Sequence, residues 1–121
     1  AGAHGLTVDI EIVEGFPVTV CDERAVTFGE TVTRDLFGPD AFRRLPDPIM
    51  GAEDFSYVLE KVPGAMFFLG FAPEGDNWAS CCGIHSTRMT LDESVMPRGA
   101  ALLAGLAERF LAEGFAFPAP E

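Results

Sequence analysis

The sequence contains the apolar run Ala65-Met66-Phe67-Phe68-Leu69-Gly70-Phe71, a continuous segment of strand length. Such a run predicts a strand that is covered on both faces, as in the sheet of an α/β protein. Pro63-Gly64 precedes it and ends a predicted helix that begins near Glu53. The apolar residues of that helix are spaced i, i+3, i+4, i+7: Phe55, Val58, Leu59 and Val62.

Two further helices and one strand are predicted around this unit. Asp22 is a good N-cap for a helix of roughly 14 residues that ends at Gly38, with the apolar stripe Ala25, Phe28, Val32 and Leu36. A last helix is expected from about Pro97 to Glu113, after the capping-box pattern Thr90-Leu91-Asp92-Glu93. Residues 7–13 alternate between apolar and acidic side chains, which is typical of a half-buried strand.

The predicted order is strand, helix, weak strand, helix, buried strand and helix. This order indicates an α/β fold with helices packed on a mixed sheet. Gly15-Phe16-Pro17 interrupts the first strand and marks a possible domain boundary. The length of 121 residues suits one domain or part of a larger one.

The charge balance argues against nucleic acid and anionic membranes as partners. The formal net charge is −11, and Arg43-Arg44 is the only adjacent basic pair, which we interpret as solvated. No apolar run approaches the roughly 20 residues that span a bilayer, and residues 1–5 do not resemble a signal peptide. Three cysteines do not make a disulfide framework, so we expect a cytoplasmic protein.

Few residues are candidates for chemistry on their own properties. His85 lies between a loop and a predicted helix, where an imidazole is suited to metal binding or proton transfer. His4, in the Gly/Ala-rich start, is interpreted as solvated. Cys81 and Cys82 suggest a zinc or redox module with His85, although adjacent cysteines rarely direct both sulfurs at one metal. Glu53-Asp54 suits the positive end of a helix dipole better than a catalytic pair.

Several segments, in order, resemble the M20 family of metal-dependent amidohydrolases. Gly15-Phe16-Pro17-Val18-Thr19-Val20-Cys21-Asp22 is similar to the Gly-Tyr-Pro-x-Thr-x-Asn-Asp segment of that family. The other matches are Met50-Gly51-Ala52-Glu53-Asp54-Phe55, Val62-Pro63-Gly64 with Phe67-Phe68-Leu69-Gly70, and Ile84-His85-Ser86 with Leu91-Asp92-Glu93. The subgroup is that of hippurate hydrolases, N-acyl-amino-acid amidohydrolases and auxin-conjugate hydrolases. The departures are Cys21 for Asn, Ala52 for Ser, Thr87 for Pro and the unfamiliar loop with Cys81-Cys82.

The resemblance implies a pair of divalent metals (zinc, manganese, cobalt or nickel) and a glutamate as general base. Of the family's metal ligands only the last histidine has a counterpart here, and it is His85. The other ligands and the base would precede this sequence. By the same resemblance Gly51, Glu53 and Asp54 would lie near the mouth of the substrate pocket.

The resemblance also implies a division of the chain. Residues 1–15 would be the last strand of an α+β lid or dimerisation domain, and residues 16–121 the C-terminal half of a zinc-peptidase-like, mixed-sheet catalytic domain. The intact protein would hydrolyse an N-acyl or N-aroyl amino acid. The chain alone would be inactive and would associate with its missing N-terminal half or with itself. The alternative is a non-catalytic interaction or dimerisation domain derived from such an enzyme.

Overall fold

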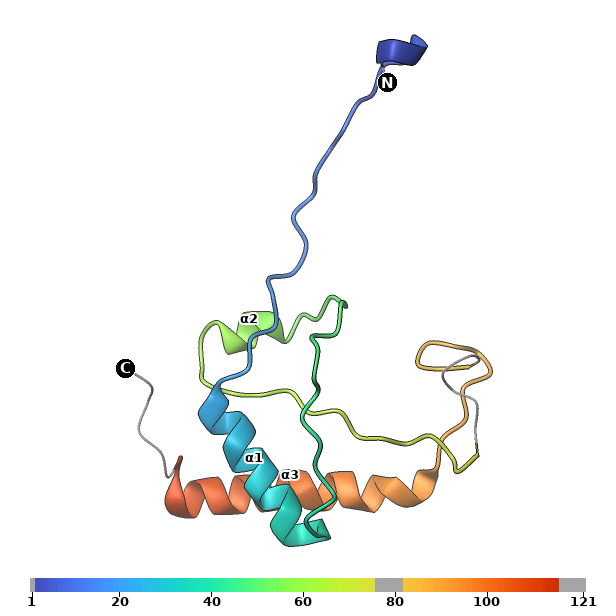
Figure 1. The fold of residues 1–121 in the computed structure, drawn as a ribbon. Coiled ribbons are helices and arrows are strands. Elements are labelled where there is room, and N and C mark those ends of the chain that lie inside the picture. The colour runs from blue at the N-terminus through green and yellow to red at the C-terminus, as the bar shows by residue number, and fades with distance from the viewer. Residues whose placement is uncertain (1, 76–81, 116–121) are drawn as a thin grey trace.

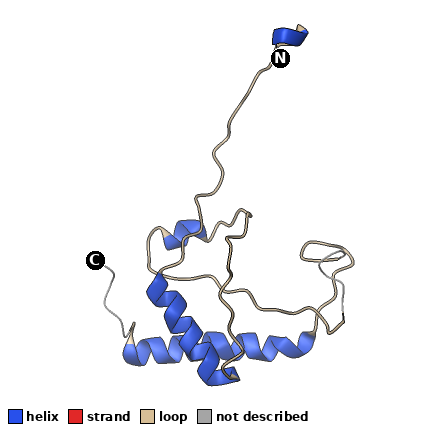
Figure 2. Cartoon of the chain, in the orientation of Figure 1, coloured by secondary structure: helices blue, strands red, loops and turns tan. Residues whose placement is uncertain are grey.

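The structure, a computed structural model, describes residues 2–75 and 82–115. Its helical elements are η1 (Gly2–His4), α1 (Glu23–Phe37), α2 (Ser56–Leu59), η2 (Glu93–Val95) and α3 (Met96–Glu113). The long helices α1 and α3 cross each other, and extended segments run over them (Figure 1). Figure 2 shows helices and loops but no strand in the described part of the chain.

Helix α1 forms as the sequence predicts because both of its ends are capped. The Asp22 carboxylate accepts a hydrogen bond from the Arg24 amide at 2.8 Å, and the Gly38 amide donates to the Arg34 carbonyl at 2.9 Å. The buried face comprises Ala25, Gly29, Val32 and Thr33. It is therefore rotated from the expected stripe, since Leu36 stays 46% exposed.

Helix α3 also agrees with the prediction. Pro97 lies in its first turn, where the missing amide hydrogen leaves no hydrogen bond unmade. The cap differs from the expected capping box, because Asp92 accepts a hydrogen bond from the Ser94 amide at 3.0 Å and begins η2. Against α1, the ring of Phe110 meets Phe28 edge-on at 6.0 Å between centroids.

The predicted strand at residues 65–71 is extended but unpaired. Its start is held to α1 by the Asp22 amide, which donates to the Gly64 carbonyl at 2.8 Å. The Met66 amide donates to the Cys21 sulfur at 3.4 Å, and the ring of Phe67 contacts that of Phe42 at 5.9 Å between centroids. The expectation of a strand within a sheet is not confirmed, because the described residues contain no strand and no segment that pairs with residues 65–71.

Gly29 is where this extended segment approaches α1 most closely. A Cβ added there would overlap the ring of Phe67, with Cε1 only 2.9 Å away. We expect Gly29→Ala to destabilise the complete protein by about 1–3 kcal/mol of overpacking, less the roughly 1 kcal/mol that alanine gains in a helix. Chemical denaturation measures the difference.

Gly99→Ala is the matched control for that substitution. It makes the same change inside α3, but the nearest atom is the flexible Cδ2 end of Leu69, at 3.0 Å. We therefore expect Gly99→Ala to be neutral or stabilising. If the two variants had equal unfolding midpoints, the close packing of Phe67 on Gly29 would be refuted.

Ion pairs made by Arg44 connect residues 41–48 to α1. Arg44 donates from Nη1 to Glu23 at 2.7 Å and from Nε to Glu30 at 2.8 Å. This guanidinium is the largest cause that lowers the pKa of both carboxyl groups. Arg44 is thus a surface residue, as expected, but one with two defined partners.

The predicted helix after Glu53 is much shorter than its apolar spacing indicated. Only Ser56–Leu59 is helical, and the Lys61 amide bonds three residues back to the Val58 carbonyl, at 3.0 Å. Pro63 and Gly64 lie just beyond, so the helix could extend at most to Val62. The four-residue α2 packs by Tyr57 against Phe16, with ring centroids 5.9 Å apart.

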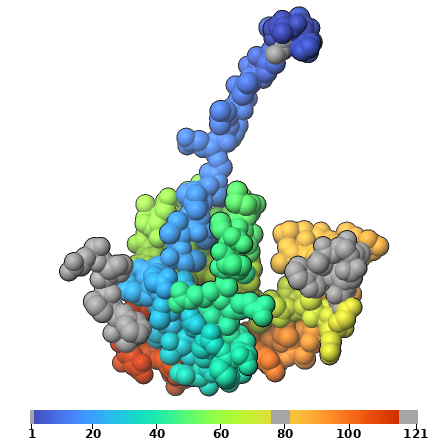
Figure 3. All heavy atoms as spheres, in the orientation of Figure 1, coloured from blue at the N-terminus to red at the C-terminus, as the bar shows by residue number. Residues whose placement is uncertain are grey.

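Residues 6–15 form an arm that projects away from the rest of the molecule (Figures 1 and 3). The arm is extended, yet it is not a strand, because no backbone hydrogen bond pairs it with another described segment. Ile10 is 76% exposed and Ile12 is 86% exposed. The apolar side chains of the arm therefore do not pack with α1 and α3, as the interruption at Gly15-Phe16-Pro17 predicted. The division into domains at residue 15 stays a prediction.

Candidate functional site

His85 lies at the surface on a tight turn. The Ser86 amide donates to the Gly83 carbonyl at 3.0 Å, which closes the turn around Ile84 and His85. The backbone of His85 has φ 71°, a left-handed conformation that only a minority of non-glycine residues adopt. The side chain is exposed, so the imidazole is available to a ligand or to another part of the complete protein.

The loop that carries His85 is closed at its base. The Asp92 amide donates to the Phe71 carbonyl at 2.8 Å, which joins the end of the extended segment to the start of η2. The Asp92 carboxylate caps η2 by accepting a hydrogen bond from the Ser94 amide. A side-chain hydrogen bond with Ser94 is the largest cause that lowers the Asp92 pKa, and the bond from the Ser94 amide adds to it. We did not predict this role for Asp92. Its position before Glu93-Ser94 is the signal that would have revealed it.

Gly51, Glu53 and Asp54 lie on the approach to α2, away from the His85 loop. Figure 1 shows α2 and the orange segment after residue 82 on opposite sides of the molecule. Glu53 is half-buried, and its carboxylate accepts from the Phe55 amide at 3.2 Å. Gly51 and Asp54 are exposed. In the chain by itself these residues shape the start of α2 and are not brought together with His85.

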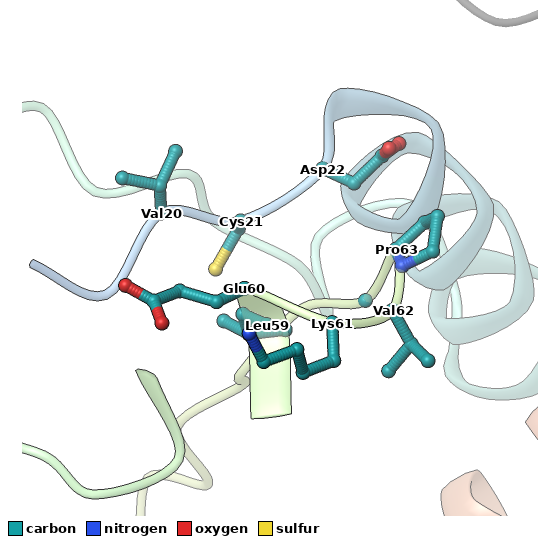
Figure 4. Close-up of a pocket in the computed structure, with 9 residues that line it drawn as sticks. Val20, Cys21, Asp22, Leu59, Glu60, Lys61, Val62 and Pro63 are labelled. Atoms are coloured by element: carbon teal, nitrogen blue, oxygen red, sulfur yellow. The ribbon is translucent and has the colours of Figure 1, made fainter. Parts of the chain in front are cut away.

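A hollow of about 390 Å³ lies where two of the family-like segments meet (Figure 4). One wall is Val20-Cys21-Asp22, and the other is residues 59–64. The Cys21 sulfur points between the two walls, where it accepts from Met66. Cys21, which departs from the family pattern, thus acts here as an acceptor that joins two segments. The sequence carries no local signal for that contact.

Asp22 is the most perturbed carboxyl group of this region. A side-chain hydrogen bond from Arg24 is the largest cause that lowers its pKa from 3.8 to about 2, and the Arg24 Nη2 to Asp22 Oδ2 distance is 2.8 Å. A lowered pKa means that ionised Asp22 favours the folded state. Its contribution is complete above the ordinary pKa and disappears as the pH falls from there through the folded-state value.

The stability of α1 should therefore depend on pH in the acid range. We expect the wild-type protein to lose stability between pH 3.8 and about 2 in part through Asp22. The Asp22→Asn variant keeps an N-cap without a titrating charge. It should therefore lose less stability than the wild type over that pH range. Arg24→Gln is the companion variant, and it should also reduce the loss, because without the guanidinium the folded-state pKa of Asp22 lies closer to 3.8. Denaturant midpoints against pH test this, and identical profiles in all three proteins would contradict it.

A larger groove of about 810 Å³ runs between residues 41–48 and residues 66–70. Its walls are mostly apolar, with Phe42, Phe67 and Leu102 among them, and Arg43, Arg98 and Asp47 among the polar residues. The backbone groups of residues 67–70 make no hydrogen bond to other described residues. The groove is thus bordered by extended backbone that is free to pair.

The described residues do not form a metal site by themselves. Within residues 2–75 and 82–115, no three His, Cys, Asp or Glu side chains gather closely enough to hold an ion. An imidazole does suit zinc, manganese, cobalt and nickel, so His85 fits as one ligand of a site completed elsewhere. Cys82 is disulfide-bonded and offers no free thiolate, and Cys81 lies outside the described residues.

None of the helices in the described ranges has the length and apolar character needed to cross a membrane.

Comparison with known proteins identifies the family. The model of peptidase family M20/M25/M40 matches residues 5–109. The IAA-amino acid hydrolase ILR1-like 2 of Arabidopsis thaliana is 39% identical over 100 residues, which cover 83% of this chain and 22% of the relative. Thermostable carboxypeptidase 1 of Saccharolobus solfataricus is 32% identical over 109 residues, 90% of this chain and 26% of the relative. N-acetyldiaminopimelate deacetylase of Lactococcus lactis is 31% identical over 98 residues, 79% of this chain and 23% of the relative.

The chain thus spans about a quarter or less of the length of these relatives. The family match includes His85, the turn around it and the segments that line the hollow at Cys21. It also agrees with a mixed α/β peptidase-like domain, although the mixed sheet itself stays a prediction. The chain belongs to peptidase family M20/M25/M40.

Proposed function

We propose that the chain is the C-terminal part of a metal-dependent amidohydrolase that hydrolyses N-acyl or N-aroyl amino acids. The observation that carries the proposal is the position of His85, an exposed imidazole on a closed loop, within the segment that matches the family. The named relatives include an amino acid hydrolase and a deacetylase, which supports an amide substrate with an amino-acid portion.

His85 would supply one ligand to a divalent metal pair. The remaining ligands and the glutamate base would come from residues outside this chain. Among the described residues, no three His, Cys, Asp or Glu side chains lie close enough together to hold an ion. When bound, the metal pair activates a water molecule and polarises the scissile amide carbonyl. The contribution of this chain is to hold the His85 imidazole on its turn while the rest of the protein completes the site.

Substrate contacts from Gly51, Glu53 and Asp54 stay a prediction. Glu53 is engaged with the backbone at the start of α2, so its side chain has a structural role in the chain by itself. A cytoplasmic location and the division of the chain at residue 15 are also predictions. The non-catalytic alternative is favoured by one observation, the exposed apolar arm, which is suited to association.

The test uses the complete protein that contains this chain. Purified protein is depleted of metal with a chelator and assayed on hippurate, N-acetyl amino acids and indole-acetyl amino acids. It is then reloaded separately with zinc, manganese, cobalt or nickel. Restored hydrolysis of any of these amides supports the proposal. Full activity in the depleted protein would refute the metal dependence. No amide hydrolysis with any metal would refute the enzyme and favour the interaction domain.

A further inference from the structure

The turn that carries His85 has the geometry of a type II β-turn. The Ser86 amide donates to the Gly83 carbonyl at 3.0 Å, so Ile84 and His85 are the two central residues. His85 has φ 71°, whereas Ile84 is not among the described residues with positive φ. A negative φ followed by a positive φ, with this hydrogen bond, defines type II. His85 therefore occupies the position that normally favours glycine or asparagine.

A histidine at this position is strained. Its Cβ crowds the backbone in the left-handed region, which glycine avoids because it has no Cβ. The expected penalty is a factor of about 5–30 in the folding equilibrium constant. Within the described residues no hydrogen bond or ion pair holds the imidazole, and the residue is exposed. No contact in the described part of the chain therefore compensates for the strain.

Hydrogen bonds nevertheless fix the backbone on the C-terminal side of His85. The Ser86 hydroxyl accepts from the Arg88 amide at 3.1 Å, and the Ser86 carbonyl accepts from the Met89 amide at 3.1 Å. Farther along, the Asp92 amide is bonded to the Phe71 carbonyl at 2.8 Å. Two consecutive turns and a closed loop base thus fix the direction in which residue 85 projects.

We propose that this turn is a positioning device, in which backbone strain at residue 85 is retained because the imidazole must project from that point. Glycine there would stabilise the protein and remove the ligand. The claim that His85 is a metal ligand rests on the proposed function, whereas the claim that the backbone is strained at residue 85 does not. The two parts have separate measurements.

The experiment compares alanine and glycine at two adjacent positions of the complete protein. The variants are His85→Ala, His85→Gly, Ile84→Ala and Ile84→Gly, all unfolded by denaturant with a chelator present, so that bound metal does not contribute. At residue 84, glycine should lower the folding equilibrium constant about two- to fivefold relative to alanine, because it gains freedom in the unfolded chain. At residue 85 the order should reverse. The folding equilibrium constant of the glycine variant should be about threefold or more above that of the alanine variant.

A local measurement keeps the test decisive if the turn opens separately from the core. Hydrogen exchange of the peptide covering residues 82–92, followed by mass spectrometry, should slow in His85→Gly relative to His85→Ala and quicken in Ile84→Gly relative to Ile84→Ala. If glycine had the same effect relative to alanine at both positions, in both measurements, the inferred strain at residue 85 would be wrong. Metal content, measured without chelator, should fall in both residue 85 variants. If it stayed at the wild-type level while the strain was observed, the ligand role would be wrong and the turn geometry would stand.

Discussion

Replacing His85 with alanine in the complete protein is expected to lower amide hydrolysis by at least about 100-fold. The figure is a lower bound, since substitutions that only support a metal ligand already cost about 10–100-fold in metal affinity or activity. His85 is exposed and makes no hydrogen bond through its side chain to other described residues, so the fold should survive its loss. Turnover and bound metal should therefore fall together, while the circular dichroism spectrum stays unchanged.

His4→Ala is the control for that substitution. His4 is also an exposed histidine, but it lies outside the residues that match the family. It should leave turnover and metal content near the wild-type values. Near-normal turnover and metal content in His85→Ala would show that His85 is not a ligand.

The sequence predicts those elements whose signals are local. Helix α1 begins after Asp22 and ends before Gly38 as expected, because each cap is satisfied by groups within a few residues. Helix α3 tolerates Pro97 for an equally local reason, since it lies in the first turn. Such elements form in a partial chain as they would in a complete one.

The predicted strands are not confirmed, because a strand forms only with a partner. Residues 65–71 have the composition of a central strand, but the backbone groups of residues 67–70 make no hydrogen bond to other described residues and would need neighbouring strands or water. Residues 7–13 are extended and exposed for the same reason. The pattern correctly indicates which residues are extended, whereas pairing depends on a second strand, which the described residues do not provide.

The sequence predicts a residue for the candidate site but not its geometry, and the role of His85 stays a prediction. His85 was identified from the Ile84-His85-Ser86 resemblance, and the family match includes it. The left-handed φ of His85 has no signature in the residue type, because the turn is set by Gly83, Ser86 and the loop closure at Asp92. The contact of Phe67 with Gly29 was likewise invisible, since it joins residues distant in sequence.

The isolated chain is expected not to be a compact monomer. A folded monomer of 13.0 kDa exposes roughly 6,300 Å² of surface, whereas this chain exposes 9943 Å². Within residues 2–75 and 82–115 the buried apolar core consists of Ala25 and Val32, and Leu103 is 71% exposed. So small a core does not offset the conformational entropy lost on folding. The chain should therefore associate with itself or remain partly unfolded.

The groove between residues 41–48 and residues 66–70 is suited to the addition of a strand. Its walls are apolar, and residues 67–70 present unpaired backbone groups to it. Addition of a strand there would satisfy those groups and cover Phe67 and Leu102 together. If a further part of the protein precedes this chain, as the proposed function requires, we expect co-expression with that part to yield a stable complex.

Analytical ultracentrifugation and unfolding experiments test this expectation. The chain alone should sediment as oligomers or as an expanded species, bind a dye specific for exposed apolar surface, and unfold without a sharp transition. The co-expressed complex should sediment as one species of defined mass and unfold cooperatively. Substituting Phe68, which is 58% exposed beside the groove, with lysine should weaken the complex more than the same change at Leu111, which is 87% exposed on α3. A compact 13.0 kDa monomer that unfolds in a two-state transition would show instead that the chain folds independently.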